Sequence, residues 1–243
     1  MSPIDNHPYG VLQFSGGKDS LACLTLLKPH WHKIIVLWCN MGDPFPETLE
    51  QMRAIKEQVP YFLEVKGNSP EWILLNGYPT DILPMSNAPV GRTMDGTDGV
   101  MLAPYYNCCW ANLWGPLEKA TKGTLTTLVI RGQRNSESMR GPVRNGNVID
   151  GIEYWLPLED WSEQQVFDYL KEQNVDLPPH YKRASTSLDC MHCTGWTHDT
   201  ADIIAWLCDT HPDEGKEVHR RLDLIIDAAQ KGIDMVKAAR HGA

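Results

Sequence analysis

The sequence predicts an α/β protein, in which a parallel sheet carries helices on both faces and is followed by a helical C-terminal part. Short apolar segments rich in β-branched residues alternate with longer segments of helical spacing in the first part of the chain. A helix between consecutive strands gives parallel pairing with right-handed crossovers. From residue 199 onward only helical patterns remain.

The first strand, helix and second strand are expected between residues 11 and 39. Residues 11–14 are an apolar run, and leucines at helical spacing follow over residues 21–28 until Pro29 ends the pattern. Residues 34–39, IIVLWC, predict a second buried strand.

The next elements are a helix over residues 46–59, which begins with a proline and has one apolar face, and a strand over residues 61–65. Residues 67–107 contain many Gly, Pro, Asn and Asp residues. We therefore expect this stretch to be rich in loops, as a lid or an insertion.

A fourth strand is predicted over residues 125–132 and a helix over residues 161–173. Ser162 and Gln165 have the spacing of a capping box at the start of that helix. The tail predicts two helices separated by DTHPDEG, residues 209–215. We divide the chain into residues 1–198 and a C-terminal helical segment, residues 199–243.

Composition bounds the function. A net charge of −9 and a pI of about 5.4 argue against direct binding to nucleic acid, which needs a basic surface. No apolar run approaches the roughly 18 residues that span a membrane, and the first residues lack the features of a signal peptide. We expect a cytoplasmic protein that does not bind membranes.

The stretch SGGKDS follows the first strand and opens the first helix. Glycines let the backbone approach an anion, and the N–H groups at a helix start point toward it. The lysine adds a positive charge and the serines add hydroxyl donors. The alternative is a surface turn. The pattern predicts a phosphate site made of Ser15, Gly16, Gly17, Lys18, Asp19 and Ser20, although its spacing is not that of the P-loop of kinases.

A second candidate anion site is the stretch RGQRNSESMRGPVR after the fourth strand. Its arginines are Arg131, Arg134, Arg140 and Arg144. Guanidinium groups match phosphate or sulfate oxygens bidentately, whereas the alternative is a solvated loop.

The seven cysteines of a cytoplasmic chain are not expected to form disulfides. Cys23, Cys39 and Cys208 lie in apolar segments and are interpreted as buried side chains. The other four form two pairs, Cys108-Cys109 and Cys190-x-x-Cys193, separated by about 80 residues. Zinc, an iron–sulfur cluster and no metal all remain open from the spacing alone.

Several motifs together resemble a known family. SGGKDS resembles the PP-loop of the ATP pyrophosphatase superfamily, and CNMGDPFPETLE (39–50) resembles the "DTG…FPET" segment of phosphoadenylyl-sulfate and adenylyl-sulfate reductases. Asn40 and Met41 depart from that pattern. RGQRNSESMR (131–140) and PLEDWSEQQVFDYL (157–170) resemble two further motifs of the reductases. The resemblance implies a PP-loop domain with the adenine nucleotide alpha hydrolase-like fold.

The resemblance also implies site residues. The ligand would be ATP or a related adenine nucleotide, and Mg²⁺ is expected with it. The SGGKDS residues and Gly132 would bind the nucleotide, and Lys18, Arg134 and Arg140 would be catalytic. Cys108, Cys109, Cys190 and Cys193 resemble the two cysteine pairs that hold a [4Fe–4S] cluster in cluster-bearing adenylyl-sulfate reductases.

The reductases use a cysteine near their C-terminus as nucleophile, and the expected tail cysteine is not found here; Cys208 is a weak substitute. One interpretation is an ATP pyrophosphatase that adenylylates an acceptor, as the resemblance to proteins of DNA phosphorothioate modification implies. A true reductase and a regulatory nucleotide-binding subunit are the alternatives. Candidate partners are an adenine nucleotide, a protein that donates sulfur or modifies the acceptor, and a second copy of the chain.

Overall fold

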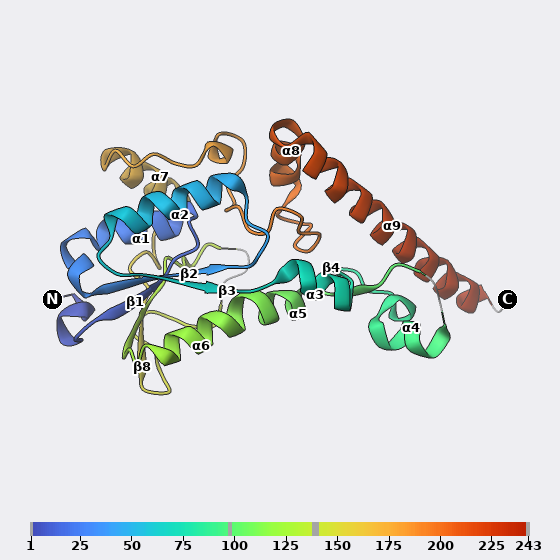
Figure 1. Cartoon of the computed structure of the whole chain (residues 1–243), viewed down its shortest axis with the longest axis horizontal. Helices are drawn as coiled ribbons and strands as arrows, with labels where there is room; N and C mark the ends of the chain where they lie inside the picture. Colours follow the sequence, from blue (N-terminus) through green and yellow to red (C-terminus); the bar gives the residue numbers. More distant parts are fainter. Residues whose placement is uncertain (1, 97–98, 138–140, 242–243) are drawn as a thin grey trace. The chain divides into compact units, whose positions relative to one another are not determined.

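The computed structural model describes residues 2–96, 99–137 and 141–241. The chain forms two compact units, each assembled from separate stretches of sequence (Figure 1). Unit 1 comprises residues 1–40, 44–66 and 115–181, and unit 2 comprises residues 41–43, 67–114 and 182–243. The sequence-based boundary at residue 198 is a different division and stays a prediction.

Unit 1 is built on a six-stranded sheet. Its order is β3-β2-β1-β6-β8-β7, and every pairing is parallel except that of the edge strand β7 with β8. The predicted parallel sheet is therefore confirmed. The strands are β1 Gly10–Gln13, β2 Ile34–Asn40, β3 Phe62–Lys66, β6 Leu128–Ile130, β7 Val148–Ile149 and β8 Ile152–Trp155.

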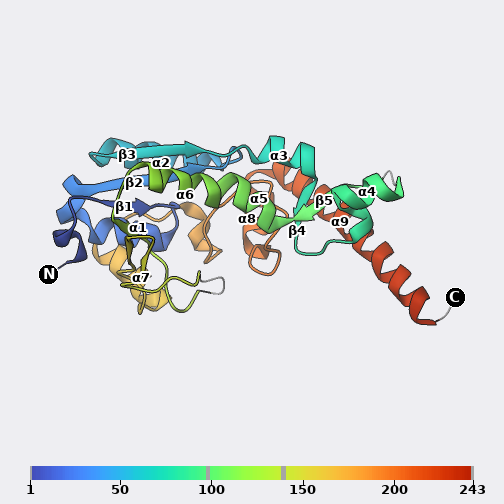
Figure 2. The same ribbon diagram turned by 90° about the horizontal axis from the view of Figure 1, so that it is seen from below.

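Helices cover both faces of this sheet, as the sequence predicted. Helices α1, α2 and α7 lie on one face and α6 on the other (Figures 1 and 2). Fully buried residues such as Leu12, Leu128 and Ile130 form the core beneath them. The bounds are α1 Lys18–Leu26, α2 Pro46–Gln58, α6 Gly115–Gly123 and α7 Glu163–Glu172.

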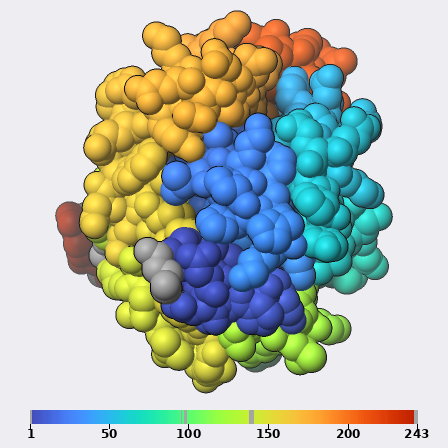
Figure 3. All heavy atoms as spheres, turned by 90° about the vertical axis from the view of Figure 1, so that its left-hand side faces the viewer, coloured from blue at the N-terminus to red at the C-terminus, as the bar shows by residue number. Residues whose placement is uncertain are grey.

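The pieces of unit 1 that are distant in sequence are close in space. Strand β1 pairs with β2 on one side and with β6, more than a hundred residues later, on the other. In the space-filling view, the blue N-terminal part of the chain lies between the cyan residues that follow it in sequence and the yellow residues of the later piece (Figure 3). The loops after β1 and β6 thus leave neighbouring strands at the same edge of the sheet.

The capping box predicted for α7 is present. Gln165 N donates to Ser162 Oγ at 3.2 Å, and Ser162 N donates to Gln165 Oε1 at 2.7 Å. This fixes the start of α7 at Glu163, whose carboxylate lies in the first turn of the helix.

Unit 2 contains the whole stretch of residues 67–107, which was expected to be rich in loops, and that expectation was wrong. The stretch does stand as an insertion in sequence between residues 44–66 and 115–181 of unit 1, as one of the two expected alternatives. It holds helices and a parallel two-stranded sheet of β4 with β5. Pro70 and Pro89 sit in the first turns of α3 and α4, and Asn68 caps α3, so these residues start helices here. The elements are α3 Ser69–Asn76, β4 Tyr78–Thr80, α4 Pro89–Asp95, β5 Leu102–Pro104, α5 Tyr105–Cys109 and a π-helical turn, Trp110–Trp114.

The C-terminal part of unit 2 is a helical hairpin, as predicted. Helix α8 spans Ala201–Thr210, and α9 spans Pro212–His241, so the break is shorter than the expected DTHPDEG linker. A proline is favourable in the first turn of a helix, which explains why α9 begins inside that stretch. None of the described helices combines the length and apolar character needed to cross a membrane.

Candidate functional site

The turn after β1 has a backbone that requires glycine. Gly16 has φ +86°, and a Cβ atom there would lie 2.6 Å from Met52 Cε. Gly17 is the N-cap of α1, and Lys18 is the first residue of that helix. The predicted phosphate loop therefore exists as a strand–turn–helix with its N–H groups at a helix start.

The donors of this turn are paired with hydroxyl groups. The backbone N–H groups donate as follows: Gly16 to Ser20 Oγ at 3.0 Å, Gly17 to Ser15 Oγ at 3.3 Å and Lys18 to Tyr181 Oη at 2.8 Å. A phosphate oxygen offers these donors the same kind of acceptor as a hydroxyl oxygen, with the advantage of charge.

Lys18 is a buried cation held between two carboxylates. Its Nζ lies 3.1 Å from Glu163 Oε1 at the start of α7 and 3.3 Å from Asp19 Oδ2. The rings of Phe167 and Tyr181 lie 5.8 and 5.7 Å from the same atom. These contacts compensate the burial of the ammonium group.

Arg134 reaches the same turn from the loop after β6. This arginine is buried, and its Nε donates to Asp19 Oδ1 at 2.5 Å. Its Nη1 donates to Ser136 Oγ at 2.8 Å, and its backbone N donates to Glu137 Oε1 at 3.0 Å. Asp19 therefore joins two predicted catalytic residues, Lys18 and Arg134, that are distant in sequence.

Among the described residues, the charged groups at the turn show no surplus of positive charge. Three carboxyl groups, of Asp19, Glu137 and Glu163, face the cations of Lys18 and Arg134. Burial raises the pKa of Glu137 above its ordinary value, because desolvation disfavours the charged form.

Gly132 allows the loop after β6 to approach the start of α1. A Cβ atom at this position would lie 2.7 Å from the carbonyl oxygen of Asp19 and 3.0 Å from Ser20 N. The predicted nucleotide-binding glycine thus lies against the predicted phosphate loop.

The other described arginines of the motif do not contact Asp19 but bind other groups. Arg131 Nε donates to Gln13 Oε1 at 2.8 Å, and its guanidinium lies 5.2 Å from the Tyr154 ring centre. Arg144 Nη1 donates to the carbonyl oxygens of Gly141 and Val143 and so braces its own loop. Arg140 lies outside the described residues.

The four paired cysteines all belong to unit 2. Cys108 and Cys109 end helix α5, and Cys190 and Cys193 lie in the loop before α8. Burial raises the pKa of Cys108 to about 11 and that of Cys193 to about 12, and it raises the pKa of Cys109 and Cys190 as well. The charges of neighbouring thiolates contribute to these pKa shifts: Cys109 acts on Cys108, both act on Cys193, and Cys193 acts on Cys190. The four thiols therefore form one electrostatic group whose thiolate form needs a nearby positive centre.

In the described part of the chain, no three His, Cys, Asp or Glu side chains are placed to hold a single metal ion. Tetrahedral zinc, with bonds of about 2.3 Å, would hold its sulfurs about 3.8 Å apart. A [4Fe–4S] cluster takes each cysteine on a different iron and so accepts a wider set. The choice of a cluster over zinc therefore rests on the resemblance of the cysteine motifs and stays a prediction.

Polar groups surround the cysteine sulfurs. Asn112 Nδ2 lies 3.7 Å from Cys108 Sγ and donates to the Cys108 carbonyl oxygen at 3.0 Å. Ser69 Oγ and Met41 Sδ each lie 3.7 Å from Cys190 Sγ. Of these groups, the amide of Asn112 and the hydroxyl of Ser69 can donate hydrogen bonds to the sulfurs.

Asp43 holds the Cys190-x-x-Cys193 loop, and the sequence analysis did not identify it. Its carboxylate accepts from His192 N at 3.0 Å and pairs with His192 Nδ1 at 3.0 Å, and its carbonyl oxygen accepts from Met191 N at 2.8 Å. From helix α9, Arg221 Nη1 donates to the His192 carbonyl oxygen at 3.1 Å. Asp43 could have been identified from the sequence, because it lies inside the motif CNMGDPFPETLE.

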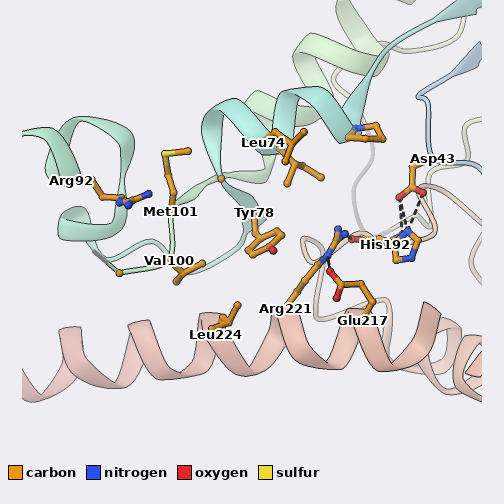
Figure 4. A pocket seen from close by; sticks show the side chains of 14 residues that line it. Asp43, Leu74, Tyr78, Arg92, Val100, Met101, His192, Glu217, Arg221 and Leu224 are labelled. Atoms are coloured by element: carbon orange, nitrogen blue, oxygen red, sulfur yellow. Dashed lines mark hydrogen bonds and ion pairs between the residues drawn. The ribbon is translucent and has the colours of Figure 1, made fainter. Parts of the chain in front are cut away.

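A cavity of about 830 Å³ lies beside this loop in unit 2. The ring of Tyr78 points into it, with the Arg221 guanidinium 5.1 Å from the ring centre and Glu217 bound to Arg221 Nε at 2.7 Å (Figure 4). The pair Asp43 and His192 borders the cavity toward the cysteine loop. Its volume suits a small molecule, and no sequence motif marked it.

Cys208, the candidate substitute nucleophile, lies on α8 within the helical hairpin. Its Sγ lies 3.6 Å from His219 Nε2 on α9. A Cβ atom at Gly215 would lie 2.8 Å from the same sulfur, so the two helices pack closely here. A cysteine beside a histidine is an arrangement that can supply a thiolate.

A comparison with known protein families gives a match over most of the chain. The family model of the phosphoadenosine phosphosulfate reductase domain matches residues 10–74 and 88–196. The chain belongs to the phosphoadenosine phosphosulfate reductase family. The family predicted from the motifs is thereby confirmed, and the matched residues include the phosphate loop, Arg134 and all four paired cysteines.

Individual members of the phosphoadenosine phosphosulfate reductase family resemble the chain at low identity. A phosphoadenosine 5'-phosphosulfate reductase of Proteus mirabilis is 27% identical over 188 residues, which cover 76% of this chain and 70% of the relative. An adenosine 5'-phosphosulfate reductase of Allochromatium vinosum is 26% identical over 117 residues, 47% of this chain and 46% of the relative. The crystal structure of a phosphoadenylyl-sulfate reductase from Candida auris, in complex with phosphate, has a TM-score of 0.49 at 18% identity and covers 76% of this chain and 82% of that one.

Proposed function

We propose that this member of the phosphoadenosine phosphosulfate reductase family is an enzyme that cleaves ATP between its α- and β-phosphates and adenylylates an acceptor. The acceptor would belong to a sulfur-transfer or nucleic-acid modification pathway, with a further protein donating the sulfur. The observation that carries the proposal is the ion-pair network of Lys18, Asp19, Arg134 and Glu163 at the start of α1.

The charge balance of this network favours ATP with Mg²⁺ over adenylyl sulfate. In the described residues its carboxyl groups are at least as numerous as its cations, which disfavours a bare polyanion. A nucleotide that arrives with Mg²⁺ brings the missing positive charge. Asp19 and Glu163 carry the oxygen ligands that Mg²⁺ prefers, and they would hold it.

In the proposed reaction an oxygen of the acceptor attacks the α-phosphorus. The bond from that phosphorus to the oxygen bridging it to the β-phosphorus breaks, and pyrophosphate leaves with the bonding electron pair. The acceptor becomes an adenylate ester, and its proton passes to solvent. No electrons are gained or lost, so the step needs no reductant.

The residues of the chain would act by position and charge. Phosphate oxygens would replace the Tyr181 hydroxyl at the Lys18 N–H, at the start of α1. Lys18 and Arg134 would stabilise the charge that develops on the leaving pyrophosphate and the α-phosphate, with Asp19 holding both cations in place. Arg140 remains a predicted third cation.

Cys108, Cys109, Cys190 and Cys193 would hold a [4Fe–4S] cluster. When bound, such a cluster ties two distant parts of the chain together and adds a local charge. Asp43 and Arg221 would keep the Cys190-x-x-Cys193 loop in place by their hydrogen bonds to His192.

The proposal is tested by product analysis of protein purified without oxygen. ATP with Mg²⁺, adenylyl sulfate and phosphoadenylyl sulfate are supplied separately, and pyrophosphate and sulfite are measured. We expect pyrophosphate from ATP and no sulfite from either sulfate. Arg134→Ala should lower pyrophosphate release by about 10²-fold, the usual loss when one donor to a developing charge is removed.

The matched control is Arg144→Ala, from the same motif. Arg144 bonds to carbonyl oxygens of its own loop, so its replacement should leave most of the activity. Equal losses in both variants would show that Arg134 has no special role. If neither product forms from any nucleotide that binds, the protein is a regulatory subunit.

A second candidate function is reduction of a nucleotide sulfate, with Cys208 as nucleophile. The contact of its Sγ with His219 Nε2 favours this alternative, because histidine can promote formation of a thiolate. Sulfite release that is supported by a thioredoxin-like dithiol and lost in Cys208→Ser would establish it and would refute the ATP proposal.

A further inference from the structure

The second half of α9 presents apolar side chains to solvent. Ile226 is 61% exposed, Ile233 49% and Val236 71%, and Ala229 lies between them on the same helix face. Exposure of this extent along one stripe is unusual for a soluble protein and marks interaction surfaces.

The stripe has the spacing of a coiled coil. Its residues, 226, 229, 233 and 236, are separated by steps of three, four and three, which is the pattern of heptad positions a and d. An adjacent face of α9, about 90° around the helix axis, is already used, because Ile225 and Ala228 are buried in a core cluster with Leu102. Helix α9 therefore has two apolar faces, of which one is covered within the chain.

Further exposed apolar side chains lie near this part of α9. A Cβ atom at Gly232 would be 3.3 Å from Pro84, so the segment before α4 packs against the helix there. Met85, Val90 and Met94 on and before α4 are all exposed. Both ribbon views place α4 beside the far half of α9 (Figures 1 and 2).

We propose that the stripe of Ile226, Ala229, Ile233 and Val236 binds the same stripe of a second copy of this chain, with the two α9 helices antiparallel. The chain would then be a homodimer whose interface lies outside the residues that match the family, 10–74 and 88–196.

Residue sizes support the antiparallel arrangement. With the symmetry axis near residue 231, Ile226 faces Val236 of the partner subunit, and Ala229 faces Ile233 of the partner subunit. Each small side chain then meets a large one, which gives even packing.

Charge supports the same register. The exposed residues that flank the seam on its other side are Asp223, Gln230 and Lys237. In the antiparallel pair, Asp223 lies opposite Lys237 of the partner subunit, twice by symmetry, and Gln230 lies opposite its own copy. In a parallel pair neither charge meets an opposite one, so the charge pattern selects the antiparallel form.

Measurement of the molar mass of the full chain tests the proposal, by sedimentation or by light scattering over a wide range of protein concentration. We expect a reversible change from the 27.5 kDa monomer to a dimer as concentration rises. Ile233→Asp should weaken the dimer by at least about 10-fold, because a carboxylate would be buried in the seam. The control is Met235→Asp, an equally drastic change at a residue that is 67% exposed on another face of α9.

Reversing the exposed charges tests whether the two α9 helices are antiparallel, and it places no charge in the apolar seam. Asp223→Lys and Lys237→Asp should each weaken the dimer, and the double variant should restore it. A chain that stays monomeric at every concentration, or a dimer that Ile233→Asp does not weaken, overturns the proposal. If the double variant dimerises as weakly as the single variants, the antiparallel register is ruled out.

Discussion

At the scale of single residues, Asp43 connects two motifs that the sequence shows as separate. It lies in the segment CNMGDPFPETLE, and it accepts hydrogen bonds from the backbone and ring of His192 in the Cys190-x-x-Cys193 loop. A carboxylate that fixes a ligand loop without being a ligand acts on metal affinity through the position of the loop.

Asp43→Ala should therefore weaken retention of iron. Loss of the carboxylate leaves His192 N without its acceptor and frees the loop, and changes of this kind cost about 10-fold or more in metal affinity. Iron per chain is measured after dialysis of anaerobic protein against a chelator. The control is Asp209→Ala, which removes only an exposed ion pair with Arg183. Equal iron in both variants would contradict the role of Asp43.

The candidate nucleotide site could be predicted only in part. Ser15 to Ser20 are contiguous, so their pattern could be recognised, and Arg134 was found through its motif. Glu163 and Tyr181 reach Lys18 from segments far along the chain, and nothing in the local sequence distinguishes Glu163 from an ordinary first-turn acid. Contacts set by tertiary packing leave no local signal.

At the scale of secondary structure, strands β1 and β2 were predictable as buried apolar runs, and the edge strand β3 was also predicted, whereas the β7–β8 hairpin was not. Strand β7 is exposed and β8 only half-buried. A signal for this hairpin was nevertheless present. Asp150 and Gly151 both have positive φ, 53° and 79°, as a two-residue Asp-Gly hairpin turn requires.

The approach of the loop after β6 to helix α1 depends on a missing side chain, which leads to a prediction. Gly132→Ala places a Cβ atom 2.7 Å from the Asp19 carbonyl oxygen, so the loop that carries Arg134 must move away from the phosphate turn. Affinity for an adenine nucleotide, measured by calorimetry, should fall by about 10-fold or more. Gly123→Ala is the control, because nothing lies within 4 Å of a Cβ atom there. Equal affinities in the two variants would place the nucleotide elsewhere.

At the scale of the whole molecule, the two units differ in what holds them together. Unit 1 has a continuous apolar core between a six-stranded sheet and its helices. In unit 2 the sheet has two strands, and the buried apolar side chains come from several separate segments, such as Leu102, Trp206 and Val218. Unit 2 joins residues 67–114 to residues 182–243, and the paired cysteines lie one pair on each. A cluster bound there would cross-link the two segments, so unit 2 should depend on it far more than unit 1 does.

Two variants test whether the cluster stabilises unit 2 more than unit 1. Cys193→Ala removes a cysteine sulfur from unit 2, and Cys23→Ala removes one from unit 1. Cys193→Ala should lose the brown colour and most of the iron, roughly four per chain in the unchanged protein. Hydrogen exchange should then accelerate in α5 and in residues 189–196, while the strands of unit 1 keep their protection. Cys23 is fully buried in the core of unit 1, so Cys23→Ala should keep its iron and change exchange only in unit 1. If iron is lost and α5 stays as protected as before, the cluster does not hold unit 2 together.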